Sequence, residues 1–298
     1  MRGRVRWLLV AGASVMVVGA VALAAVAGDR AGDGARGATS SSSAAGPTST
    51  STSTVTTSTS STTTTTSTTT PRPSTSTSTS ATTSTTAPTG PAVAVRRGPS
   101  DRPVVALTFD AGSDTGYAAA ILDTLAAEGV RASFGLTGRW TEANPALVAR
   151  MAAEGHQLVN HTWSHPSFTG ASTGSRPLST AERLDQLARA EAAIVAASGT
   201  TTKPWFRPPY GDEDASVRAD VGSAGYAYEG LWTVDSLGWK GIPAAEITER
   251  CLTRAEPGAI YLFHVGAAAA DAQALPAIID GLRAQGYRFA TLSELVAG

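Results

Sequence analysis

Residues 104–136 read VVALTFDAGSDTGYAAAILDTLAAEGVRASFGL, and this stretch decides the class of fold. Its first six residues, 104–109, form an almost wholly apolar run that predicts a buried strand. Residues 117–128 then carry apolar side chains at helical spacing, and Gly129 closes the helix, because glycine adopts the left-handed conformation cheaply. Residues 130–136 return to a strand pattern, so the stretch predicts two parallel strands joined by a helix.

The same unit recurs toward the C-terminus, where Gly155, Gly225 and Gly286 close helices as Gly129 does. Further strands are predicted at 156–160, 205–207, 226–232, 259–263 and 288–290, and further helices at 145–154, 179–199, 215–224, 244–255 and 273–285. The repetition predicts an α/β fold with a parallel sheet, either open or closed into a barrel. In both forms catalytic groups gather at the carboxyl ends of the strands.

Chemically capable side chains do follow five of the predicted strands. His161 and His165 are four residues apart, a spacing that suits two imidazoles on one metal ion. Each residue alone has a structural reading, such as a helix cap for Asp110 or a core position for His264. Five strand ends that carry such groups together are hard to ascribe to capping and packing. The residues, in chain order, are Asp110, Asp114, His161, His165, Arg207, Tyr210, Asp235, Trp239 and His264.

These segments, in this order and spacing, resemble the polysaccharide deacetylase family defined by the NodB-homology domain. The resemblance covers residues 103–295 and implies a distorted (β/α) barrel of about seven parallel strands that hydrolyses N-acetyl, occasionally O-acetyl, groups on sugar polymers. It implies that Asp110 is the catalytic base, oriented by Arg207, and that His264 is the general acid, tuned by Asp235. It also implies that His161 and His165 bind a metal and that the backbone N–H of Tyr210 stabilises the oxyanion. The residues that it implies to contact the substrate are Trp239, Leu262 and Pro209.

The sequence departs from the family pattern at two positions. The family has a second aspartate, a metal ligand, where this chain has Ala111. We hypothesise that Asp114 curls back to replace it; loss of the metal site is the alternative. A divalent metal is expected, zinc first, with cobalt, manganese or nickel also suitable. Gly238 stands where the fourth motif commonly has a second aspartate.

The N-terminal third differs in composition from the rest. Three arginines precede an apolar run at 7–27, which predicts a signal peptide or a membrane anchor within residues 1–30. Residues 31–97 are rich in Ser, Thr and Pro and are predicted to be a disordered linker, leaving residues 98–298 as the catalytic domain. We therefore expect an extracytoplasmic protein, secreted or anchored to the cell membrane, that acts on peptidoglycan or a chitin-like envelope glycan.

Composition narrows the remaining function classes. A formal net charge of −1 over 298 residues does not favour nucleic-acid binding. Cys251 is the single cysteine and is predicted to be a small buried residue rather than a reactive thiol. A monomer is expected. Two alternatives stay open: a non-catalytic carbohydrate-binding module on the same barrel, and a hydrolase of another non-peptide C–N bond. A purely structural wall protein would not account for the residues at the strand ends.

Overall fold

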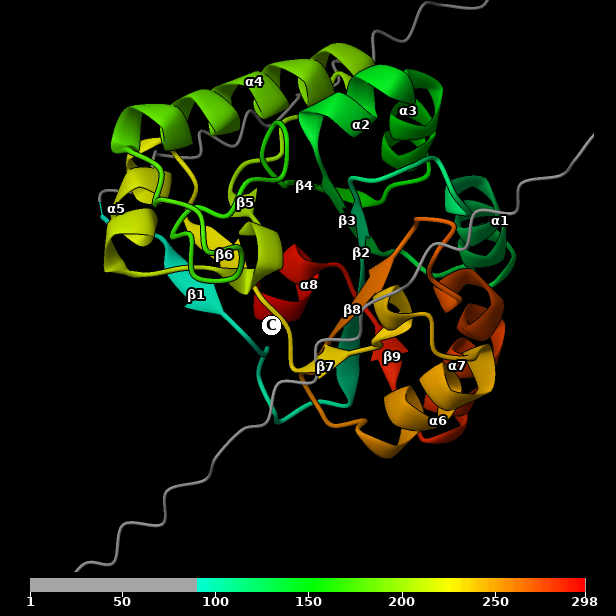
Figure 1. Cartoon of the computed structure of the whole chain (residues 1–298). Coiled ribbons are helices and arrows are strands. Elements are labelled where there is room, and N and C mark those ends of the chain that lie inside the picture. Colours follow the sequence, from blue (N-terminus) through cyan, green and yellow to red (C-terminus); the bar gives the residue numbers. More distant parts are fainter. Residues whose placement is uncertain (1–89, 298) are drawn as a thin grey trace, which may run out of the picture. The chain divides into compact units, whose positions relative to one another are not determined.

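The computed structural model describes residues 90–297 (Figure 1). The predicted leader, 1–30, and residues 31–89 of the predicted linker lie outside the described residues. The last part of the predicted linker is described, and Val93–Val95 within it form strand β1. The folded unit therefore begins before residue 98. A three-residue strand is too short to show the alternation by which sequence patterns reveal strands.

The centre of the fold is a nine-stranded sheet in which every pairing is parallel. The strand order is β1-β6-β5-β4-β3-β2-β8-β7, and β9 pairs with β2. Among residues 90–297 no pairing joins β7 to β1, so the barrel is open on that side. The strands after β1 are β2 (Val104–Ala111), β3 (Ser133–Leu136), β4 (Gln157–Asn160), β5 (Trp205–Phe206), β6 (Tyr228–Gly230), β7 (Val234–Asp235), β8 (Ile260–His264) and β9 (Arg288–Phe289).

The expected distorted (β/α) barrel is confirmed, and seven of the strands lie where the sequence predicts them. The two additional strands, β1 and β7, have three and two residues. A parallel strand needs a crossover before the next one can pair beside it, which explains why helices alternate with strands along the chain.

Helices α1 to α7 lie around the outside of the sheet, whereas the short helix α8 packs against its inner face (Figure 1). Six of them match predictions to within a few residues, and the capping box at Ser179 and Glu182 is present. The predicted helices are α1 (Ala118–Ala127), α3 (Pro145–Ala153), α4 (Thr180–Ser198), α5 (Ala215–Ser223), α6 (Ala244–Thr253) and α7 (Asp271–Ala284); the short helices α2 (Gly138–Ala143) and α8 (Leu292–Ala297) are additional. Within the described part of the chain, none of the helices is both long enough and apolar enough to cross a bilayer.

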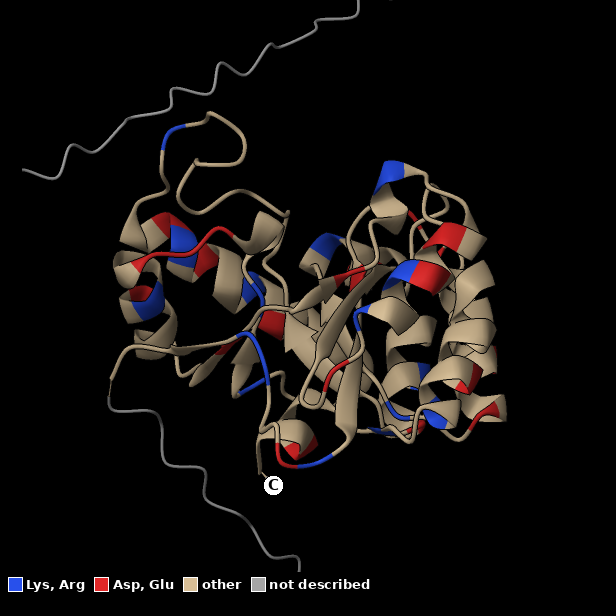
Figure 2. Ribbon diagram, turned by 90° about the horizontal axis from the view of Figure 1, so that it is seen from below, with Lys and Arg blue, Asp and Glu red and all other residues tan. Residues whose placement is uncertain are grey.

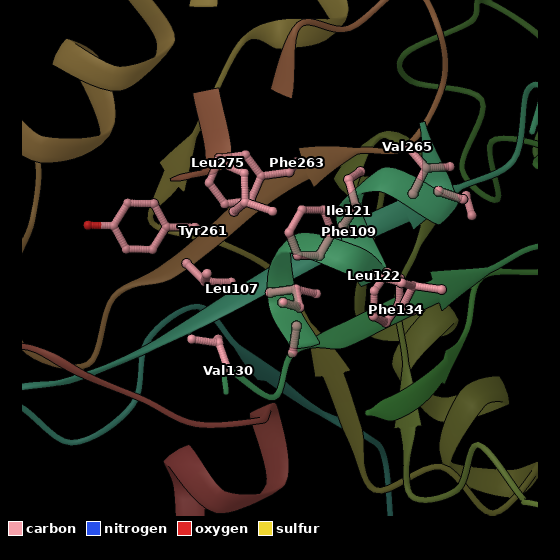
Figure 3. Packing of buried hydrophobic residues seen from close by; sticks show 14 of the residues in the cluster. Leu107, Phe109, Ile121, Leu122, Val130, Phe134, Tyr261, Phe263, Val265 and Leu275 are labelled. Atoms are coloured by element: carbon pink, nitrogen blue, oxygen red, sulfur yellow. The ribbon is translucent and has the colours of Figure 1, made fainter. Parts of the chain in front are cut away.

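A hydrophobic core fills the space between the sheet and the helices α1 and α7 (Figure 3). Phe109 lies at its centre, stacked against Phe134 on β3 and Phe263 on β8 with both pairs of ring centroids 5.3 Å apart. Cys251 is fully buried in the same core, as predicted. Because side chains alternate along β2, the outward position of Phe109 turns its neighbours Thr108 and Asp110 toward the other face of the sheet.

Charged residues of both signs are interspersed over the helices and loops, whereas the strands carry few of them (Figure 2). The buried exceptions on or beside the sheet include Arg207 and Glu229. Burying a charge costs free energy unless the charge is paired. The partners of these buried residues therefore matter for the stability of the fold.

Replacing Phe109 with alanine should cost about 3–5 kcal/mol of unfolding free energy, because it removes a fully buried ring from between two others. Urea denaturation of the purified protein measures this. Val195→Ala on α4 is the control, since Val195 is exposed and its truncation should change stability by no more than about 0.5 kcal/mol. Equal losses in the two variants would contradict the assignment of Phe109 to the core.

Candidate active site

The guanidinium of Arg207 joins three strands at their carboxyl ends. Arg207 follows β5 and is almost completely buried, with 1% of its surface exposed. Its Nη1 donates to Asp110 Oδ1 and to Thr108 Oγ1, both at 2.9 Å. Its Nε donates to the carbonyl oxygen of Gly230 on β6 at 2.8 Å. The predicted orienting role of Arg207 thus corresponds to a direct ion pair with Asp110.

Asp110 is the last but one residue of β2 and lies opposite Gly135 on β3 and His264 on β8. A Cβ atom at Gly135 would lie 2.4 Å from Asp110 Oδ1, so the glycine provides the space for this carboxylate. Burial is the largest single influence and acts to raise the pKa of Asp110, but the charge and hydrogen bond of Arg207, together with His161 and His264, outweigh it and hold the pKa below its usual value. Asp110 is therefore an ionised carboxylate that is able to accept a proton.

His161 and His165 form a pair of neutral imidazoles beside Asp110. The Nδ1 of His161 lies 2.8 Å from the carbonyl oxygen of Arg207, and because a carbonyl only accepts, Nδ1 carries the proton. Burial lowers the pKa of His161, so its Nε2 keeps a lone pair, 3.5 Å from Asp110 Oδ2. The His165 ring meets His161 edge-on at 4.8 Å between centroids, and burial lowers the pKa of His165 to about 4.

These two histidines fit the nitrogen part of a divalent metal site. An imidazole whose Nδ1–H is held by a carbonyl oxygen, and whose Nε2 lone pair is free, has the arrangement of a ligating histidine. The Nε2 lone pair of His161 faces the negative carboxylate of Asp110, and a cation beside them would be attracted by both groups.

The carboxylate part of the family's metal site is different in this chain. Ala111 carries no donor atom, and Asp114 Oδ1 accepts a hydrogen bond from the Ala267 amide at 2.9 Å. Across residues 90–297 no three His, Cys, Asp or Glu side chains are grouped so as to hold a metal ion. The hypothesis that Asp114 replaces the missing ligand is therefore not met by the geometry, because the loop after β2 directs Asp114 to the segment that follows β8.

Asp235 and His264 lie in the same cleft but are not bonded to each other. Asp235 Oδ1 accepts from the Leu237 amide at 2.9 Å, and Oδ2 accepts from Trp239 Nε1 at 3.3 Å. Among the described residues, it is the Asp271 carboxylate, and not that of Asp235, that lies 4.0 Å from the His264 ring, at Nδ1. The sequence offered little sign of this, because an acidic residue in the first turn of a helix is usually a partner of the helix dipole.

The cleft above these residues has a volume of about 530 Å³. Of the predicted substrate contacts, Trp239 and Leu262 line it, whereas the lining proline is Pro208 and not Pro209. Tyr210 also lines the cleft, and its ring packs edge-on against His165 with 4.7 Å between centroids. Ser172 and Trp232 are lining residues that the sequence did not reveal.

Backbone strain is concentrated around this cleft. Of the described non-glycine residues, four have positive φ: Thr162 (68°), His165 (62°), Tyr210 (62°) and Leu237 (61°). All four follow strand ends at the site. Such conformations cost roughly 1–3 kcal/mol each and persist where the surrounding structure enforces them, which occurs mostly at functional sites.

Comparisons with known proteins agree with this geometry. Residues 97–228 match the family model for polysaccharide deacetylase. A peptidoglycan-N-acetylglucosamine deacetylase of Bacillus cereus is 34% identical over 66% of this chain and 70% of that protein. The chain belongs to the polysaccharide deacetylase family. Another member, the peptidoglycan-N-acetylglucosamine deacetylase PgdA of Listeria monocytogenes, is 35% identical, and the chain spans 38% of its length.

Solved structures of family members show the same fold. The Bc1960 peptidoglycan N-acetylglucosamine deacetylase matches with a TM-score of 0.63 and 32% identity, over 68% of this chain and 92% of that chain. BA3943 from Bacillus anthracis, a CE4 family pseudoenzyme, matches with a TM-score of 0.62 and 28% identity over 68% of each chain. A mutant of BA3943 with restored enzymatic activity has a similar structure. The fold is therefore common to active and inactive members.

Replacing Arg207 with glutamine should destabilise the protein by about 3–5 kcal/mol at neutral pH, because Asp110 would remain as a buried charge without its partner. The folded-state pKa of Asp110 lies below its unfolded value. Its contribution to stability is therefore present above about pH 4 and is lost as the pH falls through the folded pKa. The difference between the two proteins should shrink in acid, which urea denaturation across pH measures.

The control for this prediction is Arg189→Gln, at an ion pair with Asp185 in which both side chains are about half exposed. Exposed pairs contribute little to stability. A loss in Arg207→Gln no larger than in this control would show that the buried pair does not stabilise the site.

Proposed function

We propose that this protein is an extracytoplasmic, metal-dependent hydrolase that removes N-acetyl groups from a cell-envelope polysaccharide, either peptidoglycan or a chitin-like polymer of N-acetylglucosamine. The observation that carries the proposal is an ionised Asp110, held by buried Arg207, which shares one cleft with the imidazole of His264. Relatives named as peptidoglycan deacetylases support the substrate class. The apolar run 7–27 and the Ser/Thr-rich segment after it support action outside the cytoplasm.

Asp110 is proposed to be the general base. It takes a proton from water, whose oxygen then attacks the carbonyl carbon of the N-acetyl group. Arg207 keeps the carboxylate charged and fixes its direction through Nη1. The negative charge that develops on the carbonyl oxygen is stabilised by the backbone N–H of Tyr210, a contribution of roughly 3 kcal/mol in comparable sites.

His264 is proposed to be the general acid. An amine does not leave as an anion, so the nitrogen must be protonated as the C–N bond breaks. The His264 side chain is 28% exposed and lines the cleft, where it is able to donate that proton. The products are acetate and a free amino sugar.

The cleft is suited to a sugar that carries an acetyl group. Trp239 and Tyr210 are about half exposed, with 52% and 50% of their surfaces accessible, and they offer broad apolar faces to a pyranose ring. Leu262 lines the same cleft with 4% of its surface exposed, and it lies on β8 opposite Thr108, two residues before His264. This apolar side chain is suited to the acetyl methyl group.

We also propose that His161 and His165 bind the divalent metal, with zinc first and cobalt, manganese or nickel as alternatives. When bound, such an ion polarises a carbonyl and lowers the pKa of a bound water toward about 7. With two protein nitrogens and no carboxylate at position 111, the affinity should be weaker than that of a complete three-ligand site.

Acetate release from defined chito-oligosaccharides and from peptidoglycan is the direct test, with and without a chelator. We expect release by the purified protein, a loss with chelator, and recovery when zinc is returned. Asp110→Asn and His264→Ala should each lower the rate by about 100-fold or more, because each removes a proton-transfer group.

A specific observation also favours a second function. Ala111 removes a ligand from the family's metal site, and one structural relative is a pseudoenzyme. A non-catalytic carbohydrate-binding protein would bind the same glycans and release no acetate under any metal condition. Binding without acetate release would therefore overturn the deacetylase proposal.

Ala111→Asp should tighten zinc binding by about tenfold or more and raise acetate release, because it adds a carboxylate where the family has its third ligand. Isothermal titration with zinc measures the affinity independently of activity. Ala111→Asn is the matched control, since it has the same shape without the charge.

Asp114→Ala should leave the zinc affinity of the protein unchanged, because its carboxylate is bonded to the Ala267 amide. A clear loss of zinc binding in this variant would instead identify Asp114 as a ligand that moves when the metal binds.

A further inference from the structure

We propose that Asp271, a residue outside the family's motifs, positions His264 for proton donation and supplies the negative charge that stabilises its protonated form. This inference rests on the proposed deacetylase function. It gives Asp271, on α7, the role of tuning His264 that the family resemblance gives to Asp235.

Asp271 is the first residue of α7 and is fully buried beneath the cleft. Its Oδ2 accepts a hydrogen bond from the His264 backbone amide at 2.8 Å and lies 4.0 Å from His264 Nδ1. Within the described residues, neither His264 Nδ1 nor Asp271 Oδ1 has a hydrogen-bond partner, although both atoms are buried. A rotation of the imidazole that closes this distance by about 1 Å would pair Nδ1 with the carboxylate at ordinary hydrogen-bond length.

Pairing at Nδ1 has a chemical consequence. When Nδ1–H is held by a carboxylate, the other ring nitrogen, Nε2, is the one that exchanges a proton with the substrate. The carboxylate also stabilises the imidazolium, as the buried aspartate of a Ser-His-Asp triad does.

Gly238 makes room for this carboxylate. A Cβ atom at Gly238 would lie 2.3 Å from Asp271 Oδ1, 2.6 Å from Cγ and 2.7 Å from Oδ2. The Asp271 carboxylate therefore occupies the space that a side chain at position 238 would fill. Position 238 is where the family commonly has an aspartate, so the negative charge keeps its place and arrives from a different element.

The other charged groups around His264 are already engaged. Asp110 on β2 is paired with Arg207, and both oxygens of Asp235 on β7 accept hydrogen bonds from its own loop. The imidazoles of His161 and His165 also face His264, and burial lowers the pKa of each, so they are neutral.

Asp271 is thus a fully buried carboxylate near His264, and one of its oxygens, Oδ1, lacks a hydrogen-bond partner among the described residues. Burial raises the pKa of Asp271, while the His264 amide and the neighbouring Ser236 hydroxyl act in the opposite direction. A buried carboxylate with an unpaired oxygen is costly unless a cation forms beside it, and protonated His264 is that cation.

The test compares Asp271→Asn with wild type in acetate-release kinetics. Asparagine keeps an oxygen for the His264 amide and removes the charge. We expect kcat to fall about tenfold or more with KM little changed, because the substrate contacts stay in place. The alkaline limb of the kcat profile should move to lower pH, since the imidazole loses its proton more easily without the neighbouring charge.

The matched control is Asp280→Asn, the same change at an exposed position of α7. It should leave kcat and the pH profile unchanged. A second variant, Gly238→Asp combined with Asp271→Ala, moves the carboxylate back to position 238 and should recover most of the lost activity. Asp271→Asn with wild-type kcat and pH profile would overturn the proposal, as would a lower kcat with an unchanged pH profile and no recovery in the double variant.

Histidine NMR separates this proposal from the proposed function. The titration midpoint of the His264 imidazole should move to lower pH in Asp271→Asn and not in Asp280→Asn. If wild type releases no acetate, a shifted midpoint retains Asp271 as the partner of His264 and rejects only the deacetylase assignment. An unchanged midpoint rejects the role of Asp271 whether or not the protein is active.

Discussion

The buried ion pair between Arg207 and Asp110 is the interaction on which the site depends. A guanidinium removed from water must find acceptors, and Arg207 finds them on β2 and β6. The backbone carbonyl of Arg207 also accepts a hydrogen bond from His161, the residue directly after β4. One residue therefore connects the Asp110 carboxylate, one imidazole and three strands. The barrel brings the strand ends together. A shift of β2 or β6 relative to Arg207 would leave its guanidinium unpaired, which is energetically unfavourable.

The two departures from the family pattern have different structural consequences. At Gly238 the missing side chain leaves space that the Asp271 carboxylate fills, so a negative charge remains beside His264. At Ala111 no described carboxylate takes the lost position, because Asp114 is bonded to the Ala267 amide. The residues proposed for proton transfer are thus all present in the cleft, whereas the proposed metal site keeps its two imidazoles and has no carboxylate at position 111.

The amino-acid sequence by itself determined the order of strands and helices and the strand ends that carry chemistry. These features follow from local rules. Helical and strand periodicity, glycine at helix ends and the Ser179 capping box depend on residues close together in the chain, and the structure agrees with them. Parallel strands then require that their carboxyl ends share one edge, so the sequence alone predicts that Asp110, Arg207 and His264 meet there, as they do.

Only the tertiary structure decided which groups touch. Asp271 is seven residues beyond His264 on a helix, and nothing in its local pattern distinguishes it from an ordinary acidic residue at a helix start. Likewise, Asp235 bonds within its own loop and Asp114 bonds to Ala267, although spacing alone suggested other partners. A hydrogen bond depends on distances of a few tenths of an ångström between segments remote in sequence, and those distances are set by the packing of the whole barrel.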